Sequence, residues 1–400
     1  MADDVTPSFD HIWLNDPKAV MALEAEWEVL ANETHTDIYL TPGWFKVWWR
    51  HFGKNRLLKC LVMRDRGKLV GVLPFSIERL WAGPVPVTLA RLAGTDPHCL
   101  IFRLPILKHA QSTIWNTACR DLLTNDGIDA ISLTPVSELS EMLPPAISID
   151  PSIADRIDKP AGAHTVFELP ADFDDYMTKL SKKRRSQYRR DVKGLETAFD
   201  MKTETTVPNA QDFRDFIEFH NIQWQAVGKG GHFHDWPGSS AFYPDLADTL
   251  KDKKQVQFHS QTGKSGPLAA QFALVCGGTC HWRLPARSLD DTADKLSIGK
   301  VGLVQMIKAM IEQGVTRVEG GMGTYPYKLS YGGQMVDVHQ IILSRPTAST
   351  RRRLKLVLAW SEAFNFLYYR LWFIKLAPRI RARTGMKFHA LSRHWIKTRI

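Results

Sequence analysis

Hydrophobic residues recur at helical spacing in six stretches of the chain, and this spacing predicts helices there. The second helix has typical start signals, with Thr41 as N-cap and Pro42 at the first helical position. The first helix has its apolar stripe at Val20, Leu23, Trp27 and Leu30. The predicted helices cover residues 18–33, 42–52, 110–124, 176–199, 211–227 and about 298–313.

Short apolar runs between turn residues predict strands. The clearest is a hairpin in which two strands flank the turn Asp65–Lys68. The order strand, helix, strand over residues 279–319 predicts a β-α-β unit at the end of a mostly antiparallel sheet. The predicted fold class is therefore mixed α/β (α+β). The predicted strands are 57–64, 69–77, 101–107, 130–133, 164–169, 255–259, 268–275, 279–284 and 315–319.

A length of 400 residues favours two domains over one core. We predict an N-terminal domain over 1–160, a second domain over 161–346 and a helical tail over 347–400. The N-terminus is acidic and polar, which argues against a secretory signal, and no apolar stretch predicts a spanning helix. The five cysteines lack zinc or redox spacing, so they are interpreted as reduced, buried side chains of a cytoplasmic protein.

The positive charge of the chain lies in its tail. Residues 351–400 hold thirteen Lys and Arg but one acidic residue, Glu362, a net +12 against +10 for the whole chain. Basic and aromatic residues together favour attachment to an anionic membrane surface, here the inner membrane. Nucleic acid, including tRNA, is the next hypothesis, and a helix that packs on the body is the third.

The stretch 315–333, VTRVEGGMGTYPYKLSYGG, is the strongest candidate for chemistry. It begins as a buried strand and ends in glycines, three tyrosines and a lysine. Glycine permits close backbone approach, and polar residues on loops at strand ends often line binding sites. Glu319 ends the strand, and Tyr325, Tyr327 and Lys328 follow. The alternative interpretation is a turn with tyrosines packed on the sheet edge.

Two other polar groups are candidate binding sites. The helix 176–199 has a basic face that includes Arg184 and Arg185, which is either a solvated surface or a clamp for an anion. The glycine-rich loop after residue 227 holds His232 and His234, and we expect it to border a substrate cleft rather than to bind metal. A further trio is more often structural than functional: Asp96, His98 and Arg103.

In order along the chain, several short motifs resemble a known family. They are TPGWFKVWWRHFG from residue 41, KLVGVLPF from 68, LSKKRRSQYRRDVKGLE from 180, GPLAA from 266, VEGG from 318 and YPYK from 325. Over residues 37–343 the chain resembles the GNAT-like acetyltransferases called BioF2-like or CelD-like, which are related to the Fem-type aminoacyl transferases of peptidoglycan synthesis.

The resemblance implies two GNAT-like domains and an acyl-CoA donor, such as acetyl-CoA, as co-substrate without a metal. It implies that phosphates bind where the helix after the fourth strand begins. The matching stretch here is 296–302, with a capping Ser297, the cation of Lys300 and close approach at Gly299 and Gly302. The Fem-type relatives use aminoacyl-tRNA, so that donor stays an alternative.

Acyl transfer from a thioester needs a base, polarisation of the carbonyl and an acid for the leaving thiolate. Glu319 is the first candidate for the base and His281 the second. Tyr325 or Tyr327 is the candidate acid, and Lys328 a candidate ligand for an acceptor carboxylate or phosphate. Alternatively, Glu319 forms a structural ion pair with Arg317 or Lys328.

The sequence therefore predicts an acyltransferase that acts on an amine or hydroxyl, with a role in cell-envelope polysaccharide biosynthesis as a finer hypothesis. Small molecules and saccharides are both open as acceptors. The non-catalytic alternative is a GNAT-like scaffold in a polysaccharide-synthesis complex.

Overall fold

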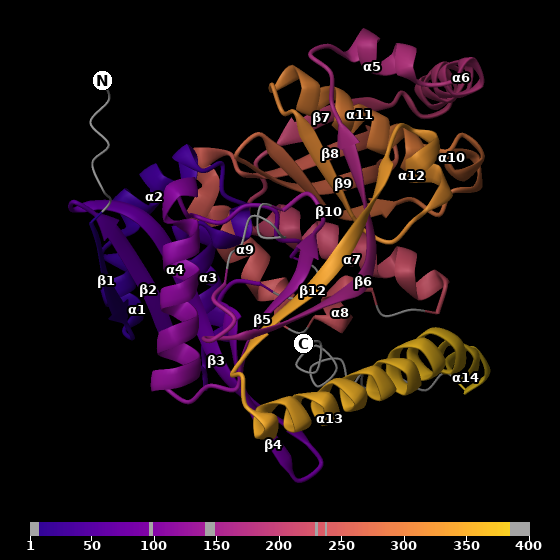
Figure 1. Cartoon of the computed structure of the whole chain (residues 1–400). Helices are drawn as coiled ribbons and strands as arrows, with labels where there is room; N and C mark the ends of the chain where they lie inside the picture. Colours follow the sequence, from indigo (N-terminus) through magenta and orange to yellow (C-terminus); the bar gives the residue numbers. More distant parts are fainter. Residues whose placement is uncertain (1–7, 96–98, 141–148, 229–230, 237, 385–400) are drawn as a thin grey trace. The chain divides into compact units, whose positions relative to one another are not determined.

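The computed structural model describes residues 8–95, 99–140, 149–228, 231–236 and 238–384. The chain forms two compact units. Of the described residues, the first unit contains those up to Ala161 together with 337–367, and the second contains those of 162–336 and 368–384. Figure 1 gives the labels of the elements. Two of the boundaries between the units fall within strands, β6 (Asp155–Glu168) and β12 (Gln334–Ser344), and a third follows Leu367.

The first unit is built on strands in the order β1-β2-β3-β4-β5-β12. Neighbours pair antiparallel except β4 and β5, which pair in parallel through Leu89–Arg91 and Ala130–Ser132. The strands not yet given are β1 (Phe9–Leu14), β2 (Leu57–Asp65), β3 (Lys68–Ala82), β4 (Val85–Leu92) and β5 (Ala130–Ser137). The helices are α1 (Pro17–Met21), α2 (Glu24–Glu33), η1 (Ile38–Leu40), α3 (Pro42–Phe52), η2 (Lys108–Ala110), α4 (Gln111–Cys119), η3 (Arg120–Asn125) and α13 (Ala348–Phe364).

A large apolar core lies between the sheet of the first unit and helix α4. Ile114, Trp115 and Ala118 of this helix pack against strand residues such as Leu61 and Phe75. Helix α3 begins as the sequence predicts, because the hydroxyl of Thr41 accepts a hydrogen bond from the backbone N–H of Trp44. Its tryptophans Trp44 and Trp48 are buried in the core.

Helix α13 packs on the sheet of the first unit. Leu354, Val357 and Leu358 lie in one cluster with Val87 and Leu89 of β4. The first part of the predicted tail is therefore a packed helix, the third of the three alternatives for that segment.

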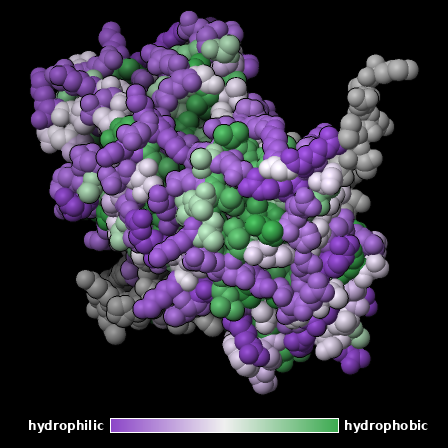
Figure 2. Space-filling model, turned by 90° about the vertical axis from the view of Figure 1, so that its left-hand side faces the viewer, coloured by the Kyte–Doolittle hydropathy of each residue, from purple (hydrophilic) through white to green (hydrophobic). Residues whose placement is uncertain are grey.

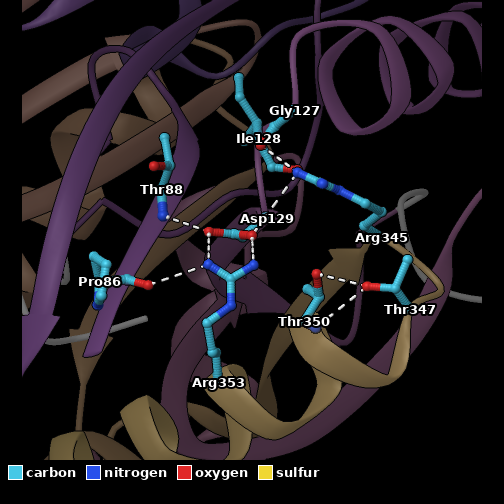
Figure 3. A network of polar contacts seen from close by, with 9 residues as sticks. All are labelled: Pro86, Thr88, Gly127, Ile128, Asp129, Arg345, Thr347, Thr350 and Arg353. Carbon is cyan, nitrogen blue, oxygen red and sulfur yellow. Dashed lines mark hydrogen bonds and ion pairs between the residues drawn. The ribbon is translucent and has the colours of Figure 1, made fainter. Parts of the chain in front are cut away.

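An ion-pair network holds the start of α13 (Figure 3). Arg353 donates to both carboxylate oxygens of Asp129, at 2.6 and 3.2 Å, and Asp129 also accepts from the backbone N–H of Thr88 at 2.9 Å. Arg351 forms a second bidentate pair with Asp155, at 2.6 and 2.9 Å. Two cations of the basic tail therefore have structural partners.

The second unit has strands in the order β6-β11-β10-β9-β8-β7, with β10 and β11 parallel and the other pairs antiparallel. This confirms the mostly antiparallel sheet with a β-α-β close. The further strands are β7 (Lys202–Thr206), β8 (Val256–Gly263), β9 (Gly266–Cys276), β10 (Thr279–Arg287) and β11 (Arg317–Met322). The helices are α5 (Phe173–Lys179), α6 (Lys182–Phe199), α7 (Ala210–Ala226), α8 (His232–Asp235), α9 (Ser239–Leu250), η4 (Lys251–Lys253), α10 (Asp291–Lys295), α11 (Ile298–Glu312) and α12 (Pro326–Ser330). Helix α13 is followed by η5 (Asn365–Leu376) and α14 (Ala377–Thr384).

Helices cover both faces of the second sheet. Helix α11 packs its buried residues on one face, together with residues of α5 and α6. On the other face, Phe213 of α7 and Tyr243 of α9 make ring contacts with Phe272 of β9, at centroid distances of 5.3 and 4.8 Å. The central strands of this unit are therefore covered on both sides and enclose their polar residues, whereas the edge strand β7 is exposed.

Four predicted elements differ from the structure. The predicted helix 18–33 is two helices, and the predicted helix 176–199 breaks at Leu180, because Ser181 is extended and caps a new helix through the N–H of Arg184. The predicted strand 101–107 is wrong: its residues make two isolated bridges, and Pro105 has no N–H to continue a ladder. The predicted loop after residue 227 contains α8.

Figure 2 shows one face of the molecule on which hydrophobic side chains gather in the middle, surrounded by hydrophilic ones. Gathered apolar side chains are typical of surfaces that bind other molecules. Within the described residues, no helix has the length and apolar character needed to span a membrane.

Candidate active site

The candidate site lies where two parallel strands stop pairing. Strand β10 pairs with β11 through Thr279–His281 and Arg317–Glu319, and no further pair joins the described residues of these two strands. An irregularity in register follows at once in each strand, between Trp282 and Leu284 in β10 and between Glu319 and Met322 in β11. Irregularities of this kind re-aim side chains and free backbone groups from the ladder. The strands are therefore positioned to place side chains around one opening in the sheet.

Glu319 is the last residue of β11 that pairs with β10, and it is 4 % exposed. Its Oε1 accepts a hydrogen bond from the backbone N–H of Gly321 at 2.6 Å and lies 3.3 Å from Nδ1 of His164 on β6. Gly321 has φ of +80°, a conformation that favours glycine and brings its N–H back to the carboxylate. The carboxylate is thus held from two sides in a fixed orientation.

His281 stands opposite Glu319 at the last paired position and is 1 % exposed. Burial lowers the pKa of its imidazole to about 4, although the nearby carboxylate of Glu319 acts in the opposite direction. The ring is therefore neutral at physiological pH. A neutral imidazole can relay a proton, but its low pKa makes it a weak base.

Lys328 on α12 places its ammonium at the same opening. Its Nζ donates to the carbonyl oxygen of Gly320 and lies 5.2 Å from the ring centroid of Trp282 and 4.9 Å from that of Tyr325. The residue is 5 % exposed, and burial lowers the pKa of its ammonium to about 8, while the charge of Glu319 opposes this shift. The lysine predicted as a ligand for acceptor anions is thus a buried cation beside the carboxylate.

The two candidate acids differ in environment. Tyr325 is 53 % exposed, and its ring lies 6.1 Å from that of Tyr327. Burial, with a smaller contribution from Tyr325, raises the pKa of Tyr327 to about 12. A phenol this weakly acidic can donate a hydrogen bond, but it does not readily give up its proton.

The start of α11 differs from the predicted phosphate loop in its cap. Ser297 occupies the N-cap position, but its backbone is left-handed, at φ +53° and ψ +39°, and its side chain makes no capping hydrogen bond within the described residues. The capping prediction is therefore wrong, because an N-cap side chain reaches the first turn from an extended backbone. Gly299 and Lys300 are half-buried there.

Gly302 does permit a close approach, but to buried side chains. A Cβ at this position would lie 2.6 Å from Nε2 of Gln271 and 2.8 Å from Oε1 of Gln261. A Cβ at Gly299 would lie 3.2 Å from Cδ of Arg287. The two glycines thus let α11 pack tightly on the strands, and phosphate binding by residues 297–302 stays a prediction.

The basic helix α6 divides into structural and exposed cations. Arg185 donates to the carbonyl oxygens of Thr178 and Leu180 at 3.0 and 2.6 Å and so completes the end of α5. Arg184 lies over the ring of Tyr331, 6.0 Å from its centroid. The exposed cations of the helix are Lys182, Lys183, Arg189, Arg190 and Lys193.

The histidines of the predicted loop lie on α8. His232 contacts the hydroxyl of Tyr243 through Nε2 at 3.1 Å, and the same hydroxyl accepts from Nε of Arg283 at 2.7 Å. His234 is exposed. Among the described side chains, no group of three or more His, Cys, Asp or Glu could hold a metal ion. Of the trio considered at the sequence level, Asp96 and His98 lie outside the described residues.

The sequence pattern did not single out His164 and Trp282 as site residues. Each lies within a predicted strand, where a single histidine or tryptophan is usually a core residue. The available signal was the neighbouring Glu319 and Lys328, whose charges need partners when buried. Of the two partners suggested for a structural ion pair with Glu319, Arg317 donates through Nε to Glu168 at 2.8 Å.

Residues 182–329, which lie within the second unit, match the family model described as "Acetyltransferase (GNAT) domain". This match identifies the protein as an acyltransferase. No curated protein matches the sequence.

Two solved structures share the fold. The crystal structure of FemX superposes with a TM-score of 0.56 at 9 % identity, over 80 % of this chain and 95 % of that one. The C-terminal domain (DUF2156) of a putative lysylphosphatidylglycerol synthetase from Agrobacterium fabrum gives a TM-score of 0.50 at 10 % identity, over 86 % and 95 %. At such identities the likeness concerns the fold alone. The predicted GNAT and Fem-type fold is thereby confirmed.

Proposed function

We propose that this protein transfers an acyl group from acyl-CoA to an amine or hydroxyl at the opening between β10 and β11. The observation that carries the proposal is the convergence of Glu319, His281 and Lys328 at the point where strand pairing ends. A carboxylate, a neutral imidazole and an ammonium in one buried place can remove a proton, supply a proton and stabilise an oxyanion.

Glu319 and Lys328 act as base and acid in a balanced reaction. The acceptor nitrogen or oxygen attacks the thioester carbon and gives its proton to Glu319, and the carbonyl electron pair moves onto oxygen. That pair re-forms the carbonyl as the C–S bond breaks, Lys328 protonates the leaving thiolate, and a proton then returns from Glu319 to Lys328. A pKa of about 8 suits Lys328 to this step, because thiols have a pKa near 8.5, whereas Tyr327 is a much weaker acid.

The donor's phosphates are proposed to bind at the start of α11, through Lys300 and the backbone around Gly299. Free N–H groups and the helix dipole favour anions at such a position. Calorimetric titration with acetyl-CoA, and with CoA as control, tests this directly. Micromolar binding that Gly299→Glu weakens at least tenfold supports the proposal, and a matched Ser240→Glu variant, at an exposed position of α9, should bind as wild type. If neither ligand binds, acyl-CoA is not the donor.

Aminoacyl-tRNA is the second candidate donor, and the surface of α6 favours it. Its five exposed cations lie on a helix that contacts the segment before α11: a Cβ at Gly194 would lie 2.7 Å from Leu296. Tight tRNA binding with a steep salt dependence, lost on substitution of Lys182 and Lys183 by Glu, supports this donor. The control is a double substitution of the exposed Lys251 and Lys253, on the short helix η4.

Attachment to an anionic membrane is proposed for the outer face of α13 and the residues after it. Leu356, Trp360 and Leu367 are 56, 44 and 58 % exposed and recur at helical spacing, with the exposed Arg352 and Lys355 beside them. Co-sedimentation with anionic vesicles at low salt should fall when Trp360 and Leu367 are replaced by Glu. Replacement of Leu57, which is 70 % exposed elsewhere in the first unit, is the control.

The acceptor is proposed to be a component of cell-envelope polysaccharide synthesis, on the resemblance described above. Product analysis by mass spectrometry after incubation with saccharide, lipid-linked and amino-acid acceptors separates these classes. If the protein binds no acyl donor but does bind vesicles through α13, the non-catalytic scaffold becomes the better hypothesis.

A further inference from the structure

A buried glutamine, Gln271, is connected to the ammonium of Lys328 through one other side chain, that of Trp282. Gln271 on β9 is fully buried, and its Oε1 accepts a hydrogen bond from Nε1 of Trp282 at 2.9 Å. An indole N–H can only donate, so the amide must present its oxygen to this tryptophan. The bond fixes the rotation of the Trp282 side chain, which is 5 % exposed.

The ring of Trp282 in turn carries the lysine. Nζ of Lys328 lies 5.2 Å from the Trp282 centroid and donates to the carbonyl oxygen of Gly320. A cation is attracted to the face of an indole, so the plane of this ring defines where the ammonium rests. A tilted ring would present its positive edge and release the lysine toward solvent.

Helix α11 holds the glutamine from the far side. The backbone at Gly302 is so close that a Cβ there would lie 2.6 Å from Nε2 of Gln271. The amide is thus confined between the helix and Trp282, and it has little freedom to turn its oxygen away. Burying an amide costs free energy because it loses hydrogen bonds to water, whereas an alkyl side chain would fill the same space without that cost. The buried amide therefore indicates a hydrogen-bonding role.

We infer that Gln271 is a positioning residue for the acyl-transfer site: through the N–H of Trp282 it sets the ring that holds the Lys328 ammonium at the opening between β10 and β11. This inference rests on the proposed function for its catalytic consequence. Its structural part stands on Gln271, Trp282 and Lys328 alone.

The test measures the titration midpoint of Lys328 directly and does not depend on turnover. Protein labelled with 13C at lysine Cε is titrated by NMR between about pH 6 and pH 11, with the Lys328 signal assigned from Lys328→Arg. The wild-type midpoint should lie at about 8. In Gln271→Leu it should rise by about one pH unit or more toward the ordinary lysine value, because the ammonium gains access to water.

Trp282→Phe keeps an aromatic ring but removes the N–H, and it should raise the midpoint in the same way. The double variant should then match Trp282→Phe, because Gln271 acts only through that N–H. The matched control is Gln257→Leu, which removes another buried glutamine from the same sheet; its amide bonds Gln313 at 2.9 Å rather than Trp282. Its Lys328 midpoint should be that of wild type.

The inference is overturned if folded Gln271→Leu keeps the wild-type midpoint, or if the effects of Gln271→Leu and Trp282→Phe add. If Gln271→Leu does not fold, Trp282→Phe alone decides, and an unchanged midpoint there also overturns the inference. In the acyl-transfer assay, kcat should fall about tenfold in Gln271→Leu with donor KM unchanged. A shifted midpoint with an unchanged kcat upholds the positioning role and refutes the role of Lys328 as the acid.

Discussion

Glu319 and His281 face each other at the last position where β10 and β11 are paired, and both are almost completely buried. A parallel pair that ends on two titratable residues is unusual for a sheet interior, where apolar side chains are the norm. The burial of the imidazole keeps it neutral, and the carboxylate is held by Gly321 and His164. This relationship places an oriented carboxylate beside the opening between the strands.

The first prediction concerns Glu319. Glu319→Gln preserves the shape of the side chain and the bond from Gly321, but it removes the base, so kcat should fall about 10²- to 10⁴-fold. Donor affinity, measured by calorimetry, should change less than threefold. Glu168→Gln, which alters the exposed partner of Arg317, is the control and should leave both unchanged. Equal losses in turnover and affinity would indicate a structural carboxylate.

The second prediction concerns the pH dependence of turnover. If Lys328 protonates the thiolate, kcat should fall as pH rises through about 8, where this ammonium loses its proton. Lys328→Arg keeps the cation but cannot release its proton, so the residual rate should be low and free of this alkaline limb. The measurement is kcat across the pH range for both proteins, with folding at each pH checked by circular dichroism. An identical limb in Lys328→Arg would assign it to another group.

The third prediction uses the same lysine as a probe of stability. Its folded-state pKa of about 8 lies below the ordinary 10.5, so between these values the unfolded chain binds more protons and stability rises with pH. At pH 7 the ionised, buried ammonium opposes folding by about 3 kcal/mol. Lys328→Met should therefore melt higher than wild type at pH 7, with a gap that narrows as pH approaches 10.5. Lys264→Met, which removes an exposed lysine, is the control for the loss of one positive charge.

The fourth prediction concerns the network at α13. Arg353→Met leaves the Asp129 carboxylate, only 6 % exposed, without its bidentate partner. Loss of a buried ion-pair partner is strongly destabilising, and because a third of the Arg353 side chain is exposed, we expect about 2 kcal/mol in urea unfolding. Arg352→Met, on the exposed side of the helix, should be neutral. Similar losses from both variants would argue against a specific role for Asp129.

Much of the fold follows from local pattern. The hairpin around Asp65–Lys68, the capped start of α3 and the end of α11 before Gly314 were predictable, because turn chemistry and apolar spacing act over a few residues. The break at Leu180 was visible only as a serine before a basic run. Pattern alone joined the two helices, because the apolar stripe continues across the break.

The candidate site was only half determined by sequence. Glu319, the glycines after it and Lys328 lie within ten residues, so their proximity is local and the sequence alone singled them out. The meeting of Glu319 with His281, with His164 on β6, and of Lys328 with Trp282 depends on which strands pair and in what register. Register is fixed by the packing of both sheet faces, and a shift of one residue would turn these side chains to the opposite face.

Contacts between distant segments also explain why the structure changes the interpretation of Lys328 and of the basic tail. From the sequence alone, Lys328 is predicted to be a ligand for an acceptor anion because it follows two tyrosines. Arg351 and Arg353 belong to a basic run. Tertiary structure buries the first beside Glu319 and pairs the other two with Asp155 and Asp129. Charge type is written in the sequence, but the surroundings that set a charge's pKa and partners come from segments far apart in the chain.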